Sequence, residues 1–129
     1  MHIGELAERT GVPAKTIRYY ETIGLVAPAT RDVNGYRRYG TRDAAVLGFV
    51  QRARSLGFPV KDVAALLALW HDRARASADV RALAREHVER IDAKLRELEA
   101  MRAALVDLTD RCHGDDRPDC PILEDLAAG

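Results

Sequence analysis

The chain has 129 residues, with 20 basic and 20 acidic side chains and only 5% aromatic residues. This length suits one compact domain, or a small domain followed by an oligomerisation element. The few aromatic residues argue against a large monomeric core, so we expect helices that pack on helices across a subunit boundary.

The charges are unevenly distributed along the chain. Residues 1–59 carry nine basic and five acidic side chains, a net charge of +4, and the rest of the chain carries −4. A basic half fits a phosphate-binding surface, although a solvated face with a chance imbalance explains the charges equally well. The first residues do not resemble a signal peptide, and the longest apolar run, residues 63–70, is too short to cross a bilayer. We expect a cytoplasmic protein with no membrane partner and no standing disulfide.

Two short helices are predicted first. Apolar residues at helical spacing indicate a helix over residues 3–8, which ends in a turn at Gly11. Pro13 suits the first position of a second helix, which continues to Gly24. Two short helices joined by a glycine-containing turn predict a helix-turn-helix.

A basic hairpin is predicted next. Asn34-Gly35 favours a type I′ turn, which needs positive φ at both central positions. The strands around it carry Arg31, Arg37 and Arg38, interleaved with tyrosines. An ordinary surface hairpin explains this pattern too, but after a helix-turn-helix it reads better as a wing that reaches the DNA backbone.

Three further helices follow. Thr41 is predicted to cap a third helix that Gly57 ends, and Pro59 to open a fourth that runs to Trp70. After a linker at residues 71–76, Ser77 is a plausible cap for a long helix over residues 77–111, which contain no Pro or Gly. Its apolar residues recur every seven positions and predict a two-stranded coiled coil. The first row is Ala84, Ile91, Leu98 and Leu105; the second is His87, Lys94, Met101 and Leu108, in which we assign His87 and Lys94 no chemistry.

The only cysteines follow this helix. Cys112 and Cys120 flank a loop that contains Gly114 and Pro118, so their sulfurs can meet. Cys120 is a plausible N-cap before Pro121, where the helix dipole favours the thiolate. Soft thiolates select Cu(I) and its congeners. Zinc prefers four ligands, and His113, Asp115 and Asp116 could supply them, so spacing alone leaves zinc open. From the residues alone, a structural or redox cysteine pair is as good an explanation as a metal site.

These pieces together resemble the MerR family of transcriptional regulators. The likeness covers the whole chain and is carried by residues 4–7 (GELA), 16–21 (TIRYYE), 24–26 (GLV), 34–39 (NGYRRY) and 54–58 (RSLGF). Residues 112–122 (CHGDDRPDCPI) resemble the copper-efflux regulator branch of that family.

The resemblance implies a mainly α fold in three parts. These are a winged helix-turn-helix DNA-binding domain (residues 1–70), a long helix that forms an antiparallel dimerisation coiled coil (77–111), and a metal-binding loop with a short helix (112–129). It further implies a homodimer that binds double-stranded promoter DNA and, with metal bound, bends and undertwists the promoter spacer so that RNA polymerase can use it. To hold DNA in this deformed shape, the protein needs phosphate contacts on both sides of the deformed segment. The DNA-binding residues carried over are Lys15, Arg18, Tyr20, Arg31, Tyr36, Arg37 and Arg54, with Lys15 the first candidate for reading bases.

The resemblance also implies a metal. The position that opens the long helix is a cysteine in divalent-sensing relatives, whereas it is Ser77 here, as in the monovalent-sensing branch. We therefore expect Cys112 and Cys120 to bind Cu(I), or Ag(I) or Au(I), and the protein to control copper efflux or detoxification genes. Sensing of a divalent metal (Zn or Hg) and thiol-redox sensing are the alternatives. A drug sensor would need a large apolar pocket, and no nucleophile–base–orienter motif supports an enzyme.

Overall fold

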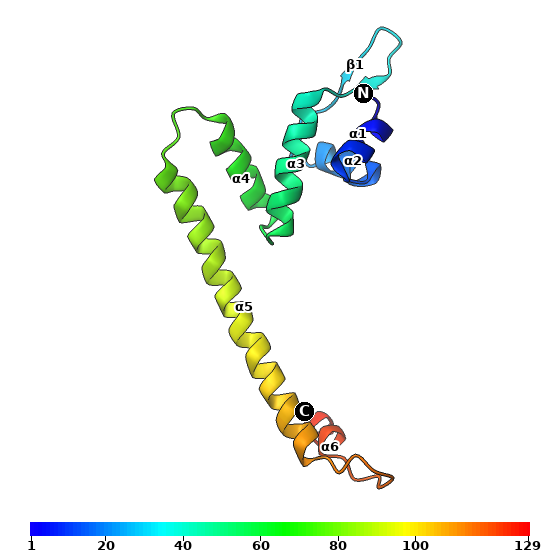
Figure 1. Ribbon diagram of the computed structural model, residues 1–129, viewed down its shortest axis with the longest axis vertical. Coiled ribbons are helices and arrows are strands. Elements are labelled where there is room, and N and C mark those ends of the chain that lie inside the picture. The colour runs from blue at the N-terminus through cyan, green and yellow to red at the C-terminus, as the bar shows by residue number, and fades with distance from the viewer. The chain divides into compact units, whose positions relative to one another are not determined.

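The computed structural model describes all of residues 1–129 and consists of six helices and one two-stranded sheet (Figure 1). The helices are α1 (Ile3–Thr10), α2 (Ala14–Thr22), α3 (Thr41–Ser55), α4 (Val60–His71), α5 (Ser77–Arg111) and α6 (Pro121–Ala128), and the strands are β1 (Thr30–Arg31) and β2 (Arg37–Arg38). The chain forms two compact units, Met1–Leu83 and Ala84–Gly129. The mainly helical fold is therefore confirmed.

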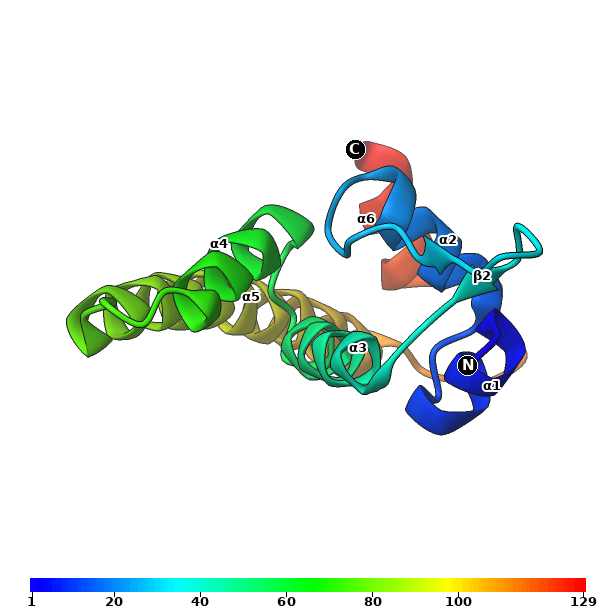
Figure 2. The same cartoon turned by 90° about the horizontal axis from the view of Figure 1, so that it is seen from above.

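The first two helices form the predicted helix-turn-helix. Gly11 ends α1 in the left-handed conformation (φ 74°) and donates its N–H to the Ala7 carbonyl at 2.9 Å. Pro13 is the N-cap of α2 and not its first helical residue, because its ψ of 144° is extended. The helix therefore begins at Ala14, one residue later than predicted. α1 packs against both α2 and α3 (Figure 2).

The core of this unit is drawn from all four of its complete helices. Its fully buried side chains are Leu6 of α1, Ile17 of α2, Leu47 and Val50 of α3, and Val63 of α4. Because apolar burial is the dominant favourable term in folding, this shared core holds α2 and the segment after it in place.

Strands β1 and β2 form the predicted hairpin, but through a different turn. Thr30 pairs with Arg38 and Arg31 with Arg37. Gly35 has φ 81° and donates its N–H to the Asp32 carbonyl at 3.0 Å, while no residue other than glycine has positive φ. The predicted type I′ turn is therefore wrong. Residues 32–35 form a type I turn that ends in a left-handed glycine.

The third and fourth helices pack against each other. α3 begins at Thr41 with Gly40, not Thr41, as its N-cap, and Asp43 Oδ2 accepts the Gly40 N–H at 2.7 Å. The cap prediction failed because this backward reach of an N3 carboxylate satisfies the helix start without a hydroxyl. Between the two helices, the rings of Phe49 and Trp70 stack with their centroids 4.6 Å apart.

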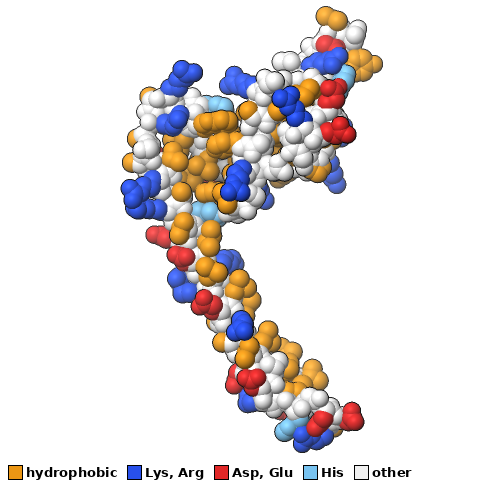
Figure 3. Space-filling model, in the orientation of Figure 1, with side chains coloured by type: hydrophobic (Ala, Val, Ile, Leu, Met, Phe, Trp, Pro, Cys, Tyr) orange, Lys and Arg blue, Asp and Glu red, His pale blue; other side chains and the backbone are white.

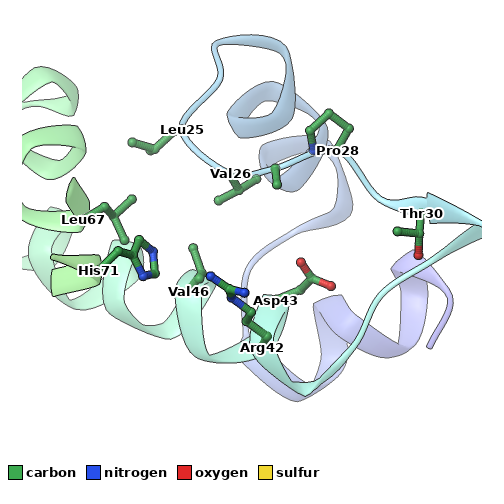
Figure 4. Close-up of a pocket in the computed structure, with 10 residues that line it drawn as sticks. Leu25, Val26, Pro28, Thr30, Arg42, Asp43, Val46, Leu67 and His71 are labelled. Carbon is green, nitrogen blue, oxygen red and sulfur yellow. The ribbon is translucent and has the colours of Figure 1, made fainter. Parts of the chain in front are cut away.

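A cavity of about 400 Å³ lies in the same unit, between the segment after α2 and helices α3 and α4. Figure 4 shows Leu67 and His71 of α4 facing Val46 and Arg42 of α3, with Leu25 and Val26 above them. The lining is mostly apolar, with Arg42 and Asp43 as its charged members. None of the residues predicted to bind DNA or metal lines it.

The long helix α5 has the bounds that the sequence predicts. Along its part in the second unit, the side chains of Val88, Ile91, Leu95, Leu98, Met101 and Leu105 are 40% to 56% exposed, and Figure 3 shows hydrophobic side chains in a row along it. Two members of the seam are buried instead, His87 and Leu108, and the Nδ1 of His87 lies 3.3 Å from Arg90 Nη2. No helix of the chain is both long and apolar enough to cross a membrane.

Candidate functional site

Two groups of predicted site residues lie in different units of the chain. The basic residues belong to α2, the β1–β2 hairpin and the end of α3, all in the first unit. The two cysteines belong to the second unit, at the junction of α5 and α6. Each group has its own local geometry.

Helix α2 carries Lys15, Arg18 and Tyr20, which are predicted to contact DNA, and is called the recognition helix below; it presents two cationic side chains that the chain itself does not use. The side chains of Lys15 and Arg18 are both exposed on α2 and make no hydrogen bond or ion pair within the chain. Tyr20, also expected to contact DNA, is only half-exposed, whereas its neighbour Tyr19 is 54% exposed. The free donors on this helix are therefore directed at solvent, as a DNA-facing helix requires.

The wing residues are ordered by contacts within the hairpin. Arg31 Nη1 donates to the Gly35 carbonyl at 2.8 Å, and Arg38 Nε donates to Asp32 Oδ2 at 3.0 Å. Asp32 Oδ1 also accepts the backbone N–H groups of Asn34 and Tyr36, at 2.9 and 3.1 Å. One carboxylate thus holds the whole turn, and Tyr36 is left 64% exposed at its edge.

The wing is also tied to the recognition helix. Arg37 Nη1 lies 3.1 Å from Glu21 Oε2, and the Tyr39 hydroxyl donates to Glu21 Oε1 at 2.6 Å. Burial and the hydrogen bond to Glu21 raise the pKa of Tyr39, so this hydroxyl remains a donor at neutral pH. Arg18, Thr22 and Arg37 line a shallow hollow between α2 and the wing together with Glu21. Two guanidinium groups in one hollow suit an anion such as a backbone phosphate.

Arg54 has a different local role from the wing arginines. Its Nη1 donates to the Phe58 carbonyl at 2.8 Å, across the turn between α3 and α4 where Gly57 has φ 85°. The side chain remains exposed, so its other guanidinium donors are open to solvent. It therefore both closes this turn and presents charge outward.

Sequence reasoning missed the acidic residues of this surface. Glu21 and Asp32 received no role of their own from the sequence, yet they organise Arg37 and Arg38. Asp32 was detectable, because Asp at the first and Gly at the fourth position is a type I turn signature. Glu21 was not, because its partners lie 16 and 18 residues along the chain.

The cysteines meet where α5 ends and α6 begins. Cys112 donates its backbone N–H to the carbonyls of Leu108 and Thr109, at 3.1 and 3.2 Å, and so continues directly from α5. Cys120 is the N-cap of α6, with Pro121 at the start of the helix, as predicted. Both thiols are free and half-buried, and they lie near enough for Cys112 to lower the pKa of Cys120.

This placement favours the thiolate form of Cys120. The backbone N–H of Leu123 is the largest influence that lowers the pKa of Cys120, and the Ile122 N–H and Cys112 lower it further. Partial burial and the charge of Glu124 act in the opposite direction but are outweighed. Unsatisfied N–H groups of the first helical turn thus stabilise the charge that a metal-binding sulfur must carry.

The other possible ligands in this loop do not gather around the thiols. His113, Asp115 and Asp116 are exposed, and Asp115 is engaged by Arg117 Nε at 2.9 Å. Nowhere in the chain do three or more His, Cys, Asp or Glu side chains form a group that could hold a metal ion. What the single chain offers is a pair of thiols.

The helix-turn-helix, the wing and the basic surface define the class of a winged-helix DNA-binding protein. Comparison with known families makes this specific. The profile described as "MerR HTH family regulatory protein" matches residues 1–69, and the one described as "MerR, DNA binding" matches residues 44–108. The chain belongs to the MerR family of DNA-binding transcriptional regulators.

Individual relatives align over all or nearly all of this chain. Heavy metal-dependent transcription regulator 2 of Rhizobium meliloti (strain 1021) is 52% identical over 100% of this chain and 88% of its own. The regulator CueR of Escherichia coli O6:H1 is 41% identical over 98% of this chain and 94% of its own. Among solved structures, the regulator PbrR691 from Ralstonia metallidurans CH34 in complex with lead(II) is similar with a TM-score of 0.85, at 29% identity and with 98% of each chain covered.

Proposed function

We propose that this protein is a homodimeric regulator that binds double-stranded promoter DNA and activates transcription when Cys112 and Cys120 bind Cu(I), or Ag(I) or Au(I). The observation that carries the proposal is the pair of free thiols at the α5–α6 junction, in which the first turn of α6 favours the Cys120 thiolate. In this proposal residues 1–70 bind DNA, 77–111 dimerise and 112–129 sense the metal. The protein then acts in the cytoplasm, on genes for copper efflux or detoxification.

The donor set supports a soft, monovalent ion. Thiolates are the ligands that soft ions prefer, and two of them suffice for a linear site, whereas zinc prefers four ligands. The chain supplies two thiols and no third side chain grouped with them. Ser77 begins α5, and in this proposal it offers a hydroxyl at the position where a third sulfur would favour a divalent ion. Relatives with heavy-metal and CueR names agree with a metal as effector.

The DNA contacts follow from the basic surface. We propose that Arg18, Arg31, Arg37 and Arg54 bind phosphates, with Tyr20 and Tyr36 beside them, and that Lys15 reads bases. Phosphate contacts position a protein on DNA without specifying the sequence. They also resist the elastic recoil of DNA whose spacer is bent and undertwisted, which costs several kcal/mol. We propose that this distortion allows RNA polymerase to use the promoter.

The dimer follows from the apolar row on α5. Six large apolar side chains that stand half-exposed along one helix form a surface of the kind that a protein interface covers. Their seven-residue repeat matches the seam of a two-stranded coiled coil. We propose that a second copy of this chain covers the row in antiparallel orientation, which brings Ser77 of one chain close to the loop of the other.

The decisive experiment is an anaerobic titration of the reduced protein with Cu(I), Ag(I), Au(I), Zn(II) and Hg(II), read by in vitro transcription from its promoter. We expect activation by the monovalent ions only. Cys112→Ser and Cys120→Ser should each abolish activation while promoter binding stays nearly unchanged, and Ser55→Ala, which changes an exposed hydroxyl on α3, is the control. Activation by Zn(II) or Hg(II) would identify a divalent sensor, the alternative that the similar lead(II)-bound regulator PbrR691 suggests. Activation by an oxidant without metal would identify a thiol-redox sensor. Either result contradicts the proposal.

A further inference from the structure

One carboxylate bridges the recognition helix and the wing. Glu21 lies in the last turn of α2, and its side chain is only 8% exposed. Its two oxygens have separate donors, since Oε2 receives Arg37 Nη1 at 3.1 Å and Oε1 receives the Tyr39 hydroxyl at 2.6 Å. Arg37 begins β2 and Tyr39 directly follows it, so both ends of this strand attach to the same group.

The two attachments are unequal. Tyr39 is buried, and its backbone N–H and carbonyl also pair with the carbonyl and nitrogen of Met1, at 2.8 and 2.7 Å. Tyr39 therefore keeps its place without Glu21. The Arg37 side chain is 47% exposed, and Glu21 is the acidic group that fixes its direction. A guanidinium has five N–H donors, so those not used by Glu21 remain available to a ligand.

Arg37 lines the hollow between α2 and the wing, so its remaining N–H donors can reach a ligand there. Arg18 and Arg37 line the hollow between α2 and the wing, with Thr22 and Glu21 between them. The guanidinium of Arg18 has no partner within the chain, although its carbonyl accepts the Thr22 hydroxyl at 2.9 Å. An anion in this hollow would receive hydrogen bonds from two guanidinium groups that belong to different elements of the fold, Arg18 to α2 and Arg37 to β2.

We infer that Glu21 is a positioning residue for DNA binding: it holds Arg37 against α2 so that Arg37 and Arg18 together bind one backbone phosphate in this hollow. The inference rests on the proposed DNA contacts of Arg18 and Arg37. It has an unusual consequence. Glu21 is a negative charge on the face that meets a polyanion, and yet its loss weakens binding because a long, mobile arginine is then no longer oriented.

The test is Glu21→Gln in the full-length protein, measured as affinity for the promoter and for a random duplex over a range of salt concentrations. The amide keeps the shape of the side chain but loses the charge that holds Arg37. We expect affinity to fall about fivefold near 0.15 M salt and the slope of log affinity against log salt to shrink by about one, the effect of one lost phosphate contact. Glu8→Gln, an exposed acid on α1, is the matched control and should leave affinity unchanged or slightly raised.

Repeating the Glu21→Gln change in a protein that lacks Arg37 distinguishes a positioning role of Glu21 from a role in folding. In Arg37→Ala protein, Glu21→Gln should cause no further loss of affinity or slope, because no arginine remains to be oriented. Tyr39→Phe removes the other bond to Glu21 and should leave the salt slope unchanged. An increase in affinity on Glu21→Gln, or an equal loss in the Arg37→Ala background, would overturn the inference while the proposed function stands. If the unaltered protein bound neither duplex, the proposed function itself would fail.

Discussion

Arg38 Nε lies 3.0 Å from Asp32 Oδ2, and this ion pair joins the two strands of the wing next to its turn. Asp32 is partly buried, which raises the pKa of its carboxyl. Hydrogen bonds from Arg38, Tyr36 and Asn34 outweigh that effect and hold the pKa below its ordinary value. The order of the wing therefore depends on an ionised Asp32.

The first prediction is that the wing loosens in acid. Because the pKa of Asp32 is lower in the folded protein, its contribution is complete above the ordinary value of about 3.9 and is lost as the pH falls through the lower folded pKa. Amide exchange of Asn34 and Tyr36 should lose protection in that range. Asp32→Ala should lose it at every pH, whereas Asp32→Asn should keep part, since its oxygen still accepts from the turn. Protection that does not change with pH in the unaltered protein would show that Asp32 does not hold the turn.

The second prediction concerns Arg37 as a phosphate ligand. Arg37→Ala should weaken binding to promoter and random duplexes alike and shrink the salt slope by about one. Arg73→Ala, an exposed arginine in the linker after α4, is the control and should change neither quantity. A loss restricted to one base-pair position would mean that Arg37 reads sequence.

A third prediction follows from the thiolate character of Cys120. In the Cys112→Ser protein, alkylation of Cys120 should reach half its maximal rate below the ordinary thiol pKa of about 8.5, because the Leu123 and Ile122 N–H groups remain in place. In denaturant, where α6 is lost, the midpoint should return to that ordinary value. Identical midpoints in both states would show that the first turn of α6 does not stabilise the thiolate.

Ser77 is the subject of the fourth prediction. If a missing third thiolate keeps the site monovalent, Ser77→Cys should raise the affinity for Zn(II) and Hg(II), measured by competition with a chelator of known strength. Ser77→Ala is the matched control and should not. Transcription is a secondary readout, because bound metal must also favour the DNA-distorting state. Unchanged divalent affinity in a folded, dimeric Ser77→Cys protein would place Ser77 away from the metal.

The fifth prediction tests the core that supports α2 and the wing. Val50 is fully buried in α3, whereas Val33 is fully exposed at the tip of the wing. Val50→Ala should lower the free energy of unfolding by about 2 kcal/mol, and Val33→Ala by well under 0.5 kcal/mol. Denaturant unfolding at one fixed protein concentration measures both, since dimer stability depends on concentration. Equal effects of the two changes would contradict the packing around Val50.

The sequence alone predicted the features that depend on neighbours in the chain. Gly11, Gly57 and Pro121 mark helix ends because each acts on backbone within a few residues, and the long helix follows from 35 residues without Pro or Gly. The family was recognisable for the same reason, since its motifs are short and contiguous. Cys120 as the N-cap of α6 is likewise a local property.

The tertiary structure decided what depends on residues distant in sequence. Glu21 meets Arg37 and Tyr39 only because the core orients α2 against the hairpin, and no spacing rule relates positions 16 and 18 residues apart. The turn of the wing also escaped prediction, because the carboxylate of Asp32 satisfies its backbone N–H groups and so favours a type I over a type I′ conformation. Local preferences therefore determined which elements form, and packing between them determined which charges meet.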